Sequence, residues 1–165
     1  MLDCQTELGE FFMQEQYRVQ GVLETRGYTV INTSGMENNS DVILAKPVDG
    51  RLTIVGLAEI KCRKSAGGVP LTRKYLSENG GYLITNQKLK YGGFASSLYR
   101  VPFFVIVSLM EENVILVWQI TDSKGNFVEK YDIKKTVTRK TVNGGEIARE
   151  NAFLPINSKY LTTIE

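Results

Sequence analysis

A carboxylate and an ammonium group stand two residues apart in the stretch LTIVGLAEIKCRK, residues 52–64. The apolar residues before them are typical of a buried strand. Because side chains at positions i and i+2 of a strand share a face, we expect Glu59 and Lys61 to point the same way. Ile60, which lies between them, then points into the core and anchors the strand.

A second carboxylate, Asp41, opens the preceding apolar stretch, DVILAKP at residues 41–47. If the two stretches pair as an antiparallel hairpin, the start of the first lies beside the end of the second. Asp41 and Glu59 would then converge at one end of the sheet, with Lys61 pointing toward Asp41 on the same face.

Two carboxylates on rigid strand ends, together with the backbone carbonyl of Ile60, would form an all-oxygen site. Such a site suits Mg²⁺, which takes one or two carboxylates and keeps several waters, or Mn²⁺. A metal ion polarises a phosphate and lowers the pKa of a water, and Lys61 would position that water or neutralise developing charge. This chemistry is that of phosphodiester hydrolysis. A lone Glu-x-Lys is common, however, and its ordinary interpretation is a solvated strand end with a surface ion pair.

The composition excludes several classes of function. The 165 residues include no histidine, which removes Ser-His-Asp catalysis, Cys-His catalysis and histidine metal sites. The formal net charge of +2 is too small to indicate nucleic acid by itself. The two distant cysteines, Cys4 and Cys62, have neither disulfide nor zinc spacing and indicate a cytoplasmic setting. Because no stretch approaches the roughly 18 apolar residues of a membrane span, and the N-terminus does not resemble a secretion signal, we expect no membrane contact.

An amphipathic helix is expected over residues 3–26, ahead of these strands. Apolar residues recur there at steps of three and four: Leu8, Phe11, Phe12, Val19, Val22 and Leu23. Glu15 fits the same stripe, and a buried carboxylate is costly unless a positive group meets it. The alternatives are that the helix turns slightly and leaves Glu15 at the rim, or that Glu10 or Glu7 takes its place.

The rest of the chain predicts one dominant sheet with helices, an α/β or α+β fold. We expect strands at 28–33, 41–47, 51–62, 101–110 and 113–121, helical segments at 71–79 and from Thr85 to about Tyr99, and either a strand or a helix entry at 82–85. The pair Gly92-Gly93 weakens the second helix. A core domain is expected over 1–120, and a β-rich extension over 121–165 that is packed on the core or contiguous with it.

This order of elements and charges resembles the PD-(D/E)XK nuclease superfamily, whose restriction-endonuclease-like core runs helix, three-strand meander, helix, strand. The resemblance covers roughly residues 8–110. It implies that Asp41 and Glu59 bind a divalent metal, that Lys61 is the catalytic lysine, and that Glu15 assists the metal from the first helix. The sequence GVLETRGYTVINTSG, followed by SDVILA and VGLAEIKCRK, is similar to archaeal Holliday-junction resolvases and related phage nucleases. Ser40 stands where the superfamily signature has proline.

Basic residues cluster after the predicted site, with Tyr75, Tyr82 and Tyr91 among them. In a nuclease these residues would contact DNA phosphates; the candidates are Arg63, Lys64, Arg73, Lys74, Gln87, Lys88 and Lys90. The resemblance adds that nucleases of this superfamily often carry a polar or basic residue near Gln87 and Lys88 that contacts the scissile phosphate. The later run KKTVTRK, 134–140, is either a basic strand that grips DNA or a solvated edge strand. For the single residues of this region the alternative is a solvated loop.

The sequence therefore predicts a Mg²⁺- or Mn²⁺-dependent deoxyribonuclease, of which a branched-DNA endonuclease of phage or mobile-element type is the first subclass to consider. A homodimer is compatible with this function, because cutting two strands needs two sites. The expected location is the cytoplasm, or the host cytoplasm if a phage encodes the chain. The alternatives are a non-catalytic nucleic-acid-binding protein with the same fold, an RNA-acting nuclease, and an interaction protein in which Asp41, Glu59 and Lys61 form an ordinary ion-pair network. The sequence leaves open endo- or exo-cleavage and sequence or branch specificity.

Overall fold

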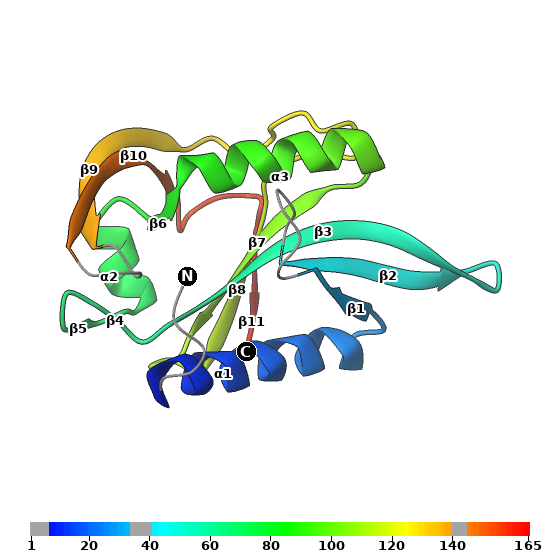
Figure 1. The fold of residues 1–165 in the computed structure, drawn as a ribbon, viewed down its shortest axis with the longest axis horizontal. Coiled ribbons are helices and arrows are strands. Elements are labelled where there is room, and N and C mark those ends of the chain that lie inside the picture. Colours follow the sequence, from blue (N-terminus) through cyan, green and yellow to red (C-terminus); the bar gives the residue numbers. More distant parts are fainter. Residues whose placement is uncertain (1–6, 34–40, 140–144) are drawn as a thin grey trace.

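The computed structural model describes residues 7–33, 41–139 and 145–165, and in this part of the chain a six-stranded sheet is covered by helices on both faces (Figure 1). The helices are α1 (Glu7–Thr25), α2 (Arg73–Glu78) and α3 (Asn86–Tyr99). The strands of the large sheet, in spatial order, are β1 (Thr29–Asn32), β2 (Val42–Val48), β3 (Arg51–Arg63), β7 (Phe103–Leu109), β8 (Val114–Gln119) and β11 (Leu161–Ile164).

The remaining strands form two smaller sheets. The first has the order β6 (Tyr82–Thr85), β10 (Glu146–Leu154) and β9 (Asp132–Arg139), and the second pairs β4 (Ser65–Ala66) with β5 (Val69–Pro70). The segment 82–85 is thus a strand that leads directly into α3. The predicted basic run 134–140 lies in β9 as far as Arg139, and Lys140 is outside the described residues.

The large sheet is mixed. Strands β1, β2 and β3 form an antiparallel meander, β3 and β7 are parallel, and β8 and β11 continue antiparallel. A parallel neighbour needs a crossover connection, and the chain makes it through α2, β6 and α3. The predicted mixed α+β class is confirmed: along the chain α1 precedes β1, β2 and β3, then β4, β5, α2, β6 and α3 follow, and β7 returns to the large sheet.

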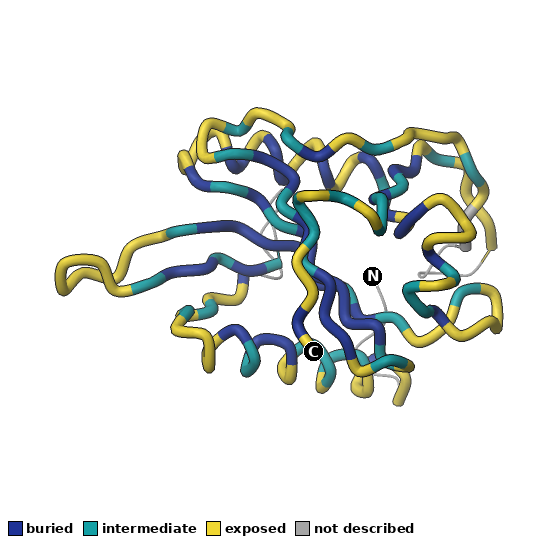
Figure 2. The backbone as a smooth tube through the Cα atoms, turned by 180° about the vertical axis from the view of Figure 1, so that it is seen from behind, coloured by how far each residue is buried: buried dark blue, intermediate teal, exposed yellow. Residues whose placement is uncertain are grey.

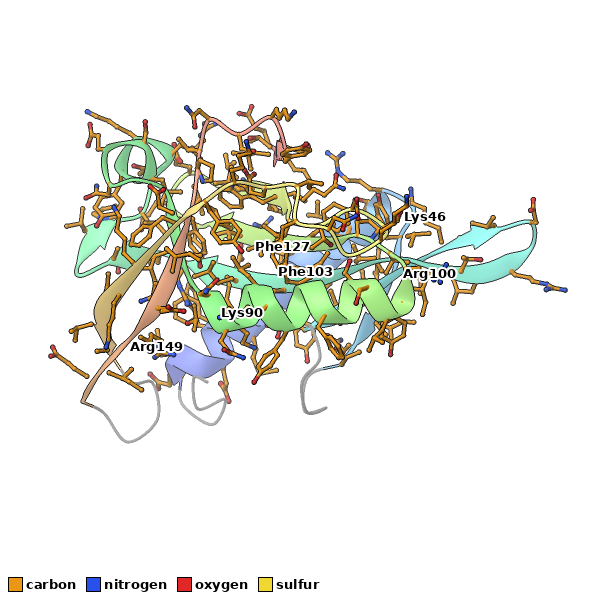
Figure 3. All side chains as sticks on the ribbon, turned by 90° about the horizontal axis from the view of Figure 1, so that it is seen from above. Lys46, Lys90, Arg100, Phe103, Phe127 and Arg149 are labelled. Atoms are coloured by element: carbon orange, nitrogen blue, oxygen red, sulfur yellow. The ribbon has the colours of Figure 1, made fainter. Side chains whose placement is uncertain are left out.

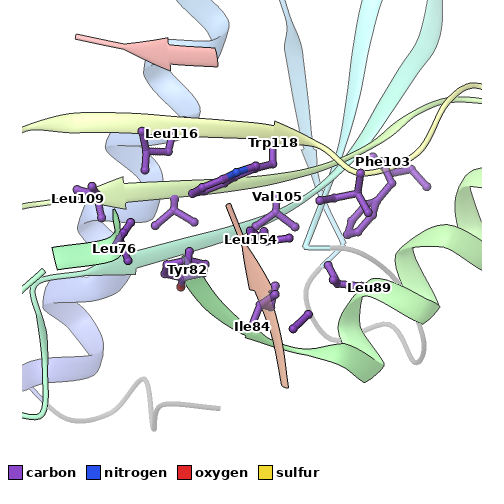
Figure 4. Packing of buried hydrophobic residues seen from close by; sticks show 14 of the residues in the cluster. Leu76, Tyr82, Ile84, Leu89, Phe103, Val105, Leu109, Leu116, Trp118 and Leu154 are labelled. Carbon is purple, nitrogen blue, oxygen red and sulfur yellow. The ribbon is translucent and has the colours of Figure 1, made fainter. Parts of the chain in front are cut away.

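Two apolar layers stabilise the sheet, one on each face, because alternate side chains of each strand point to opposite sides. The layer under α1 contains Val19, Leu23, Val42, Ala58 and Ile60, among others. The other layer lies between the sheet, α3 and the small sheet, and Figure 4 shows its packing around Trp118, Tyr82 and Phe103. The rings of Tyr82 and Trp118 stack with centroids 6.0 Å apart.

The C-terminal residues are contiguous with the core. Strand β11 pairs with β8 at one edge of the large sheet, and β10 pairs with β6 in the small sheet. Ala152 and Leu154 of β10 are fully buried in the layer beneath α3. The segment 121–165 therefore completes both sheets.

The hairpin of β2 and β3 extends beyond the helices, and its tip is exposed (Figure 2). At the other end of the hairpin, β2 and β3 lie within the covered part of the sheet. No described helix is both long enough and apolar enough to cross a membrane.

Candidate active site

The hairpin register brings Asp41 and Glu59 together. Val42, the first residue of β2, pairs with Ala58 of β3, so Asp41 lies opposite Glu59 just before β2 begins. Val42, Ala58 and Ile60 point into the apolar layer under α1. Because side chains alternate along a strand, Glu59 and Lys61 point to the other face, toward α3. The predicted anchoring of the strand by Ile60 is confirmed, since this side chain is buried in the core.

Contacts among these residues are short. The Lys61 Nζ lies 2.6 Å from Glu59 Oε1 and 3.6 Å from Asp41 Oδ2. The backbone N–H of Ile60 donates to Asp41 Oδ2 at 3.0 Å, which fixes that carboxylate against β3. The Glu59 side chain is only 2% exposed. The ammonium group of Lys61 is thus bracketed by two carboxylates, one of them buried.

A second ammonium group reaches the same buried oxygen. Lys88, in the first turn of α3, places its Nζ 3.2 Å from Glu59 Oε1. Lys88 is half exposed, so its ammonium group lies between the buried carboxylate and solvent. Asp41, Glu59, Lys61 and Lys88 therefore form a group of two negative and two positive side chains, hereafter the Asp41–Glu59 site.

Burial and the neighbouring charges shift the pKa values of Asp41 and Lys61. Burial raises the pKa of Asp41 above its ordinary 3.8, and the Glu59 carboxylate adds to the increase, against the opposite effect of Lys61. Burial acts to lower the pKa of Lys61, but the carboxylates of Glu59 and Asp41 outweigh it and raise that pKa above 10.5. Lys61 is therefore an ammonium group at neutral pH. Burial destabilises the ionised form of Asp41, and positive charge beside the carboxylate would reduce this effect.

The residues present fit a divalent ion that takes few protein ligands. Asp41 and Glu59 both reach the point that the Lys61 ammonium occupies. The Ile60 N–H points to β2, and the carbonyl of the same residue lies on that edge of β3. Two carboxylates and one carbonyl suit Mg²⁺, which keeps several waters. Within residues 7–33, 41–139 and 145–165, no three His, Cys, Asp or Glu side chains form a larger metal-binding group.

The structure does not bring Glu15 to this site. Its carboxylate accepts hydrogen bonds from Arg18, at 2.7 Å from Nη2, and from Ser108 Oγ, also at 2.7 Å. Ser108 of β7 pairs with Cys62 of β3, whose side chain lies in the layer under α1. Glu15 is therefore on the opposite face of the sheet from Glu59 and Lys61, and its predicted place in the metal cluster is wrong.

Local contacts explain why Glu15 tolerates its inward position. The predicted inward orientation is confirmed, since the side chain is 14% exposed. Burial acts to raise the pKa of Glu15, but the hydrogen bonds from Arg18 and Ser108 outweigh it and lower that pKa. The alternatives Glu10 and Glu7 are exposed in the first turn of the same helix, which packs on the layer away from Glu59.

The predicted DNA-contacting residues separate into two groups. Arg63 follows Lys61 on the same face of β3, and Lys88 is part of the site. Gln87 and Lys90 are exposed on α3, with Lys90 Nζ 3.9 Å from Glu150.

The other predicted residues lie farther along the chain, after β3 and in α2. Lys64 is exposed immediately after β3, and Lys74 is exposed on α2 with its Nζ 3.9 Å from Glu78. Arg73 lies on α2 between Glu112 and Glu165, at 3.5 Å and 3.2 Å. Glu165 is mostly exposed and Arg73 is partly exposed, so their ion pair contributes little to stability.

Two contacts at the site were not predicted. The ion pair of Lys88 with Glu59 joins α3 to β3, and residue spacing gives no signal for it because the two are far apart in the sequence. The donation from the Ile60 N–H to Asp41 depends on the register of the hairpin.

Comparisons of the chain with protein-family models, curated proteins and solved structures found no match. The chemistry of the Asp41–Glu59 site is therefore inferred from its own geometry.

Proposed function

We propose that this chain is a divalent-metal-dependent deoxyribonuclease of the PD-(D/E)XK type, with Asp41, Glu59 and the Ile60 carbonyl as the ligands of Mg²⁺ or Mn²⁺. The observation that carries the proposal is the position of Lys61, whose Nζ lies 2.6 Å from the buried Glu59 carboxylate and 3.6 Å from Asp41. The order of the elements, with β7 parallel to β3 after the meander and α3, supports it.

The side chains of the site have distinct roles in this proposal. When bound, a divalent ion supplies Lewis acidity toward a phosphate oxygen and lowers the pKa of a water. Lys61 remains protonated at neutral pH, because its pKa is raised. It therefore neutralises charge that develops on the phosphate, or orients the attacking water, and does not accept a proton. Lys88 lies on the solvent side of Glu59 and attracts the DNA backbone.

The finer features of the proposal concern the substrate and the assembly. A branched-DNA endonuclease of phage or mobile-element type, acting in the cytoplasm of its host, is the subclass proposed, by analogy with the resolvases that the sequence resembles. A homodimer would supply two sites for cutting two strands.

The test is cleavage of supercoiled plasmid, linear duplex, single-stranded DNA, a four-way junction and an RNA duplex, each with Mg²⁺, Mn²⁺ or EDTA. Lys61→Ala is compared with Lys124→Ala, which removes an exposed lysine in a distant turn. We expect metal-dependent cleavage of DNA by the wild type and by Lys124→Ala, and none by Lys61→Ala.

The other outcomes decide among the alternatives. Binding of DNA without cleavage in any metal would favour a non-catalytic binding protein. Cleavage of RNA alone would make the chain a ribonuclease. Neither binding nor cleavage, with no heat of Mg²⁺ binding in calorimetry, would leave an ordinary ion-pair network.

A further inference from the structure

Helix α3 packs against the protein mainly through small residues. Apart from Leu89, its buried face consists of Asn86, Gly92, Gly93, Ala95 and Ser96. A Cβ atom added at Gly92 would lie 2.2 Å from the Phe103 ring, and one added at Gly93 would lie 2.6 Å from the Phe127 ring. Figure 3 shows both rings beside the helix. The helix continues through the two glycines because this close packing offsets their low helix propensity.

The large apolar side chains of α3 point away from the protein instead. Tyr91 is 42% exposed, and Phe94 and Leu98 are each 66% exposed. Steps of three and four residues place these three side chains on one stripe, hereafter the α3 outer face. A helix of a soluble protein normally buries such residues and exposes its small and polar ones. The reversed arrangement indicates that the α3 outer face has a partner.

Charge around this face favours a polyanion. Helix α3 contains no Asp or Glu, and it carries Lys88 and Lys90. Arg100 forms its C-terminal cap, and Figure 3 shows Lys90 and Arg100 on the helix. Glu150 lies 3.9 Å from Lys90, but both side chains are mostly exposed, so this pair contributes little. A second copy of the chain placed on this face would bring the basic groups together with no carboxylate of α3 between them.

We propose that the α3 outer face binds DNA with unpaired bases, which stack on Tyr91 and Phe94 while Lys88 and Lys90 contact the backbone. Exposed aromatic rings beside basic groups are the features of sites for single-stranded nucleic acid. Lys88 also contacts Glu59, so a strand lying along α3 leads to the Asp41–Glu59 site. This inference rests on the proposed function and names its substrate, DNA that is single-stranded or opened at a branch.

The test measures binding to a fluorescein-labelled oligothymidine by anisotropy in EDTA, beside an abasic oligonucleotide of equal length. The abasic strand keeps the phosphates and removes the stacking surface. We expect Phe94→Ala to weaken binding to oligothymidine about 5- to 100-fold, and to leave binding to the abasic strand unchanged. The matched control is Tyr17→Ala, which removes a 56% exposed ring from α1 and should change neither affinity.

The inference would be overturned by equal affinity of Phe94→Ala and the wild type for oligothymidine, or by equal affinity of the wild type for both strands. A loss of self-association in Phe94→Ala, with unchanged DNA binding, would also overturn it and make the face a dimer contact. Failure of the nuclease proposal has a different signature. Plasmid would then stay uncut by the wild type in every metal, while the anisotropy measurement still reports on stacking.

Discussion

Replacing Lys61 by methionine separates a cation-binding site from an ordinary ion-pair network. The variant removes the ammonium group that lies 2.6 Å from Glu59 and 3.6 Å from Asp41, and keeps an unbranched side chain of similar length. Loss of one partner of a buried ion pair costs about 3–5 kcal/mol. Here Lys88 stays 3.2 Å from Glu59 and the Lys61 side chain is 25% exposed. We therefore expect a loss of about 2 kcal/mol in EDTA at pH 7, or a decrease of about 4–8 °C in Tm.

Magnesium should restore much of this loss. In the wild type the ion competes with the Lys61 ammonium for Glu59, whereas in Lys61→Met it meets two carboxylates without that competitor. A ligand at ten times its dissociation constant adds about 1.4 kcal/mol to the free energy of unfolding. The difference in stability between the variant and the wild type should therefore shrink by about 1 kcal/mol or more in saturating Mg²⁺.

Urea unfolding followed by Trp118 fluorescence measures this effect, because Trp118 is the one tryptophan of the chain and is fully buried. The matched control is Arg18→Met, which breaks the ion pair with Glu15 on the other face of the sheet. The loss of stability in Arg18→Met should be the same with Mg²⁺ and with EDTA. If the loss in Lys61→Met is likewise independent of Mg²⁺, the cation site does not exist.

Three further predictions concern Asp41, Glu15 and Cys62. The pKa of Asp41 is raised on folding, so its contribution to stability is present below about pH 3.8 and is lost as the pH increases through the folded pKa. Asp41→Asn should therefore be at least as stable as the wild type at pH 7 in EDTA, and Mg²⁺ should fail to raise its Tm. A clear loss of stability of this variant in EDTA would contradict the prediction. The pKa of Glu15 is lowered, so its contribution is present above the unfolded pKa and is lost as the pH decreases through the folded one. In urea titrations the free energy of unfolding of Glu15→Gln should be lower than that of the wild type by about 1 kcal/mol at pH 7 and by less at pH 3. The variant should cleave DNA like the wild type. Loss of cleavage would show that Glu15 belongs to the catalytic group. Burial raises the pKa of the Cys62 thiol to about 12, so in native Cys4→Ser protein, mass spectrometry should find no iodoacetamide adduct at pH 8; rapid labelling would show that Cys62 is accessible.

The convergence of Asp41, Glu59 and Lys61 could be predicted because it depends on local rules. Alternation along one strand places Glu59 and Lys61 on one face, and the pairing of neighbouring strands brings Asp41 beside them. Both rules act within a hairpin, where the chain offers few alternatives.

The place of Glu15 could not be predicted in the same way. The apolar stripe of α1 shows correctly that Glu15 faces inward, but the stripe does not say which face of the sheet the helix covers. That choice depends on how the whole chain winds around the sheet. Neither the sequence of α1 nor the Glu-x-Lys spacing specifies it.

Helix α3 shows a second limit of sequence patterns. The segment YGGFASSLY contains large apolar residues at helical spacing, which ordinarily predicts a buried stripe. In the structure the glycines face Phe103 and Phe127, while Phe94 and Leu98 are exposed. The rings of Phe103 and Phe127 fill the space between α3 and the rest of the protein. The positions of these rings are set by β7 and by the turn after β8.

The most direct test of the central proposal is the relaxation of supercoiled plasmid by the purified wild type and by Lys61→Ala, in Mg²⁺ and in EDTA. The proposal predicts nicked or linear DNA with the wild type in Mg²⁺, and intact plasmid in EDTA and with the variant in either condition. Cleavage by Lys61→Ala at the wild-type rate, or cleavage by the wild type in EDTA, would contradict the assignment of the Asp41–Glu59 site as the catalytic centre.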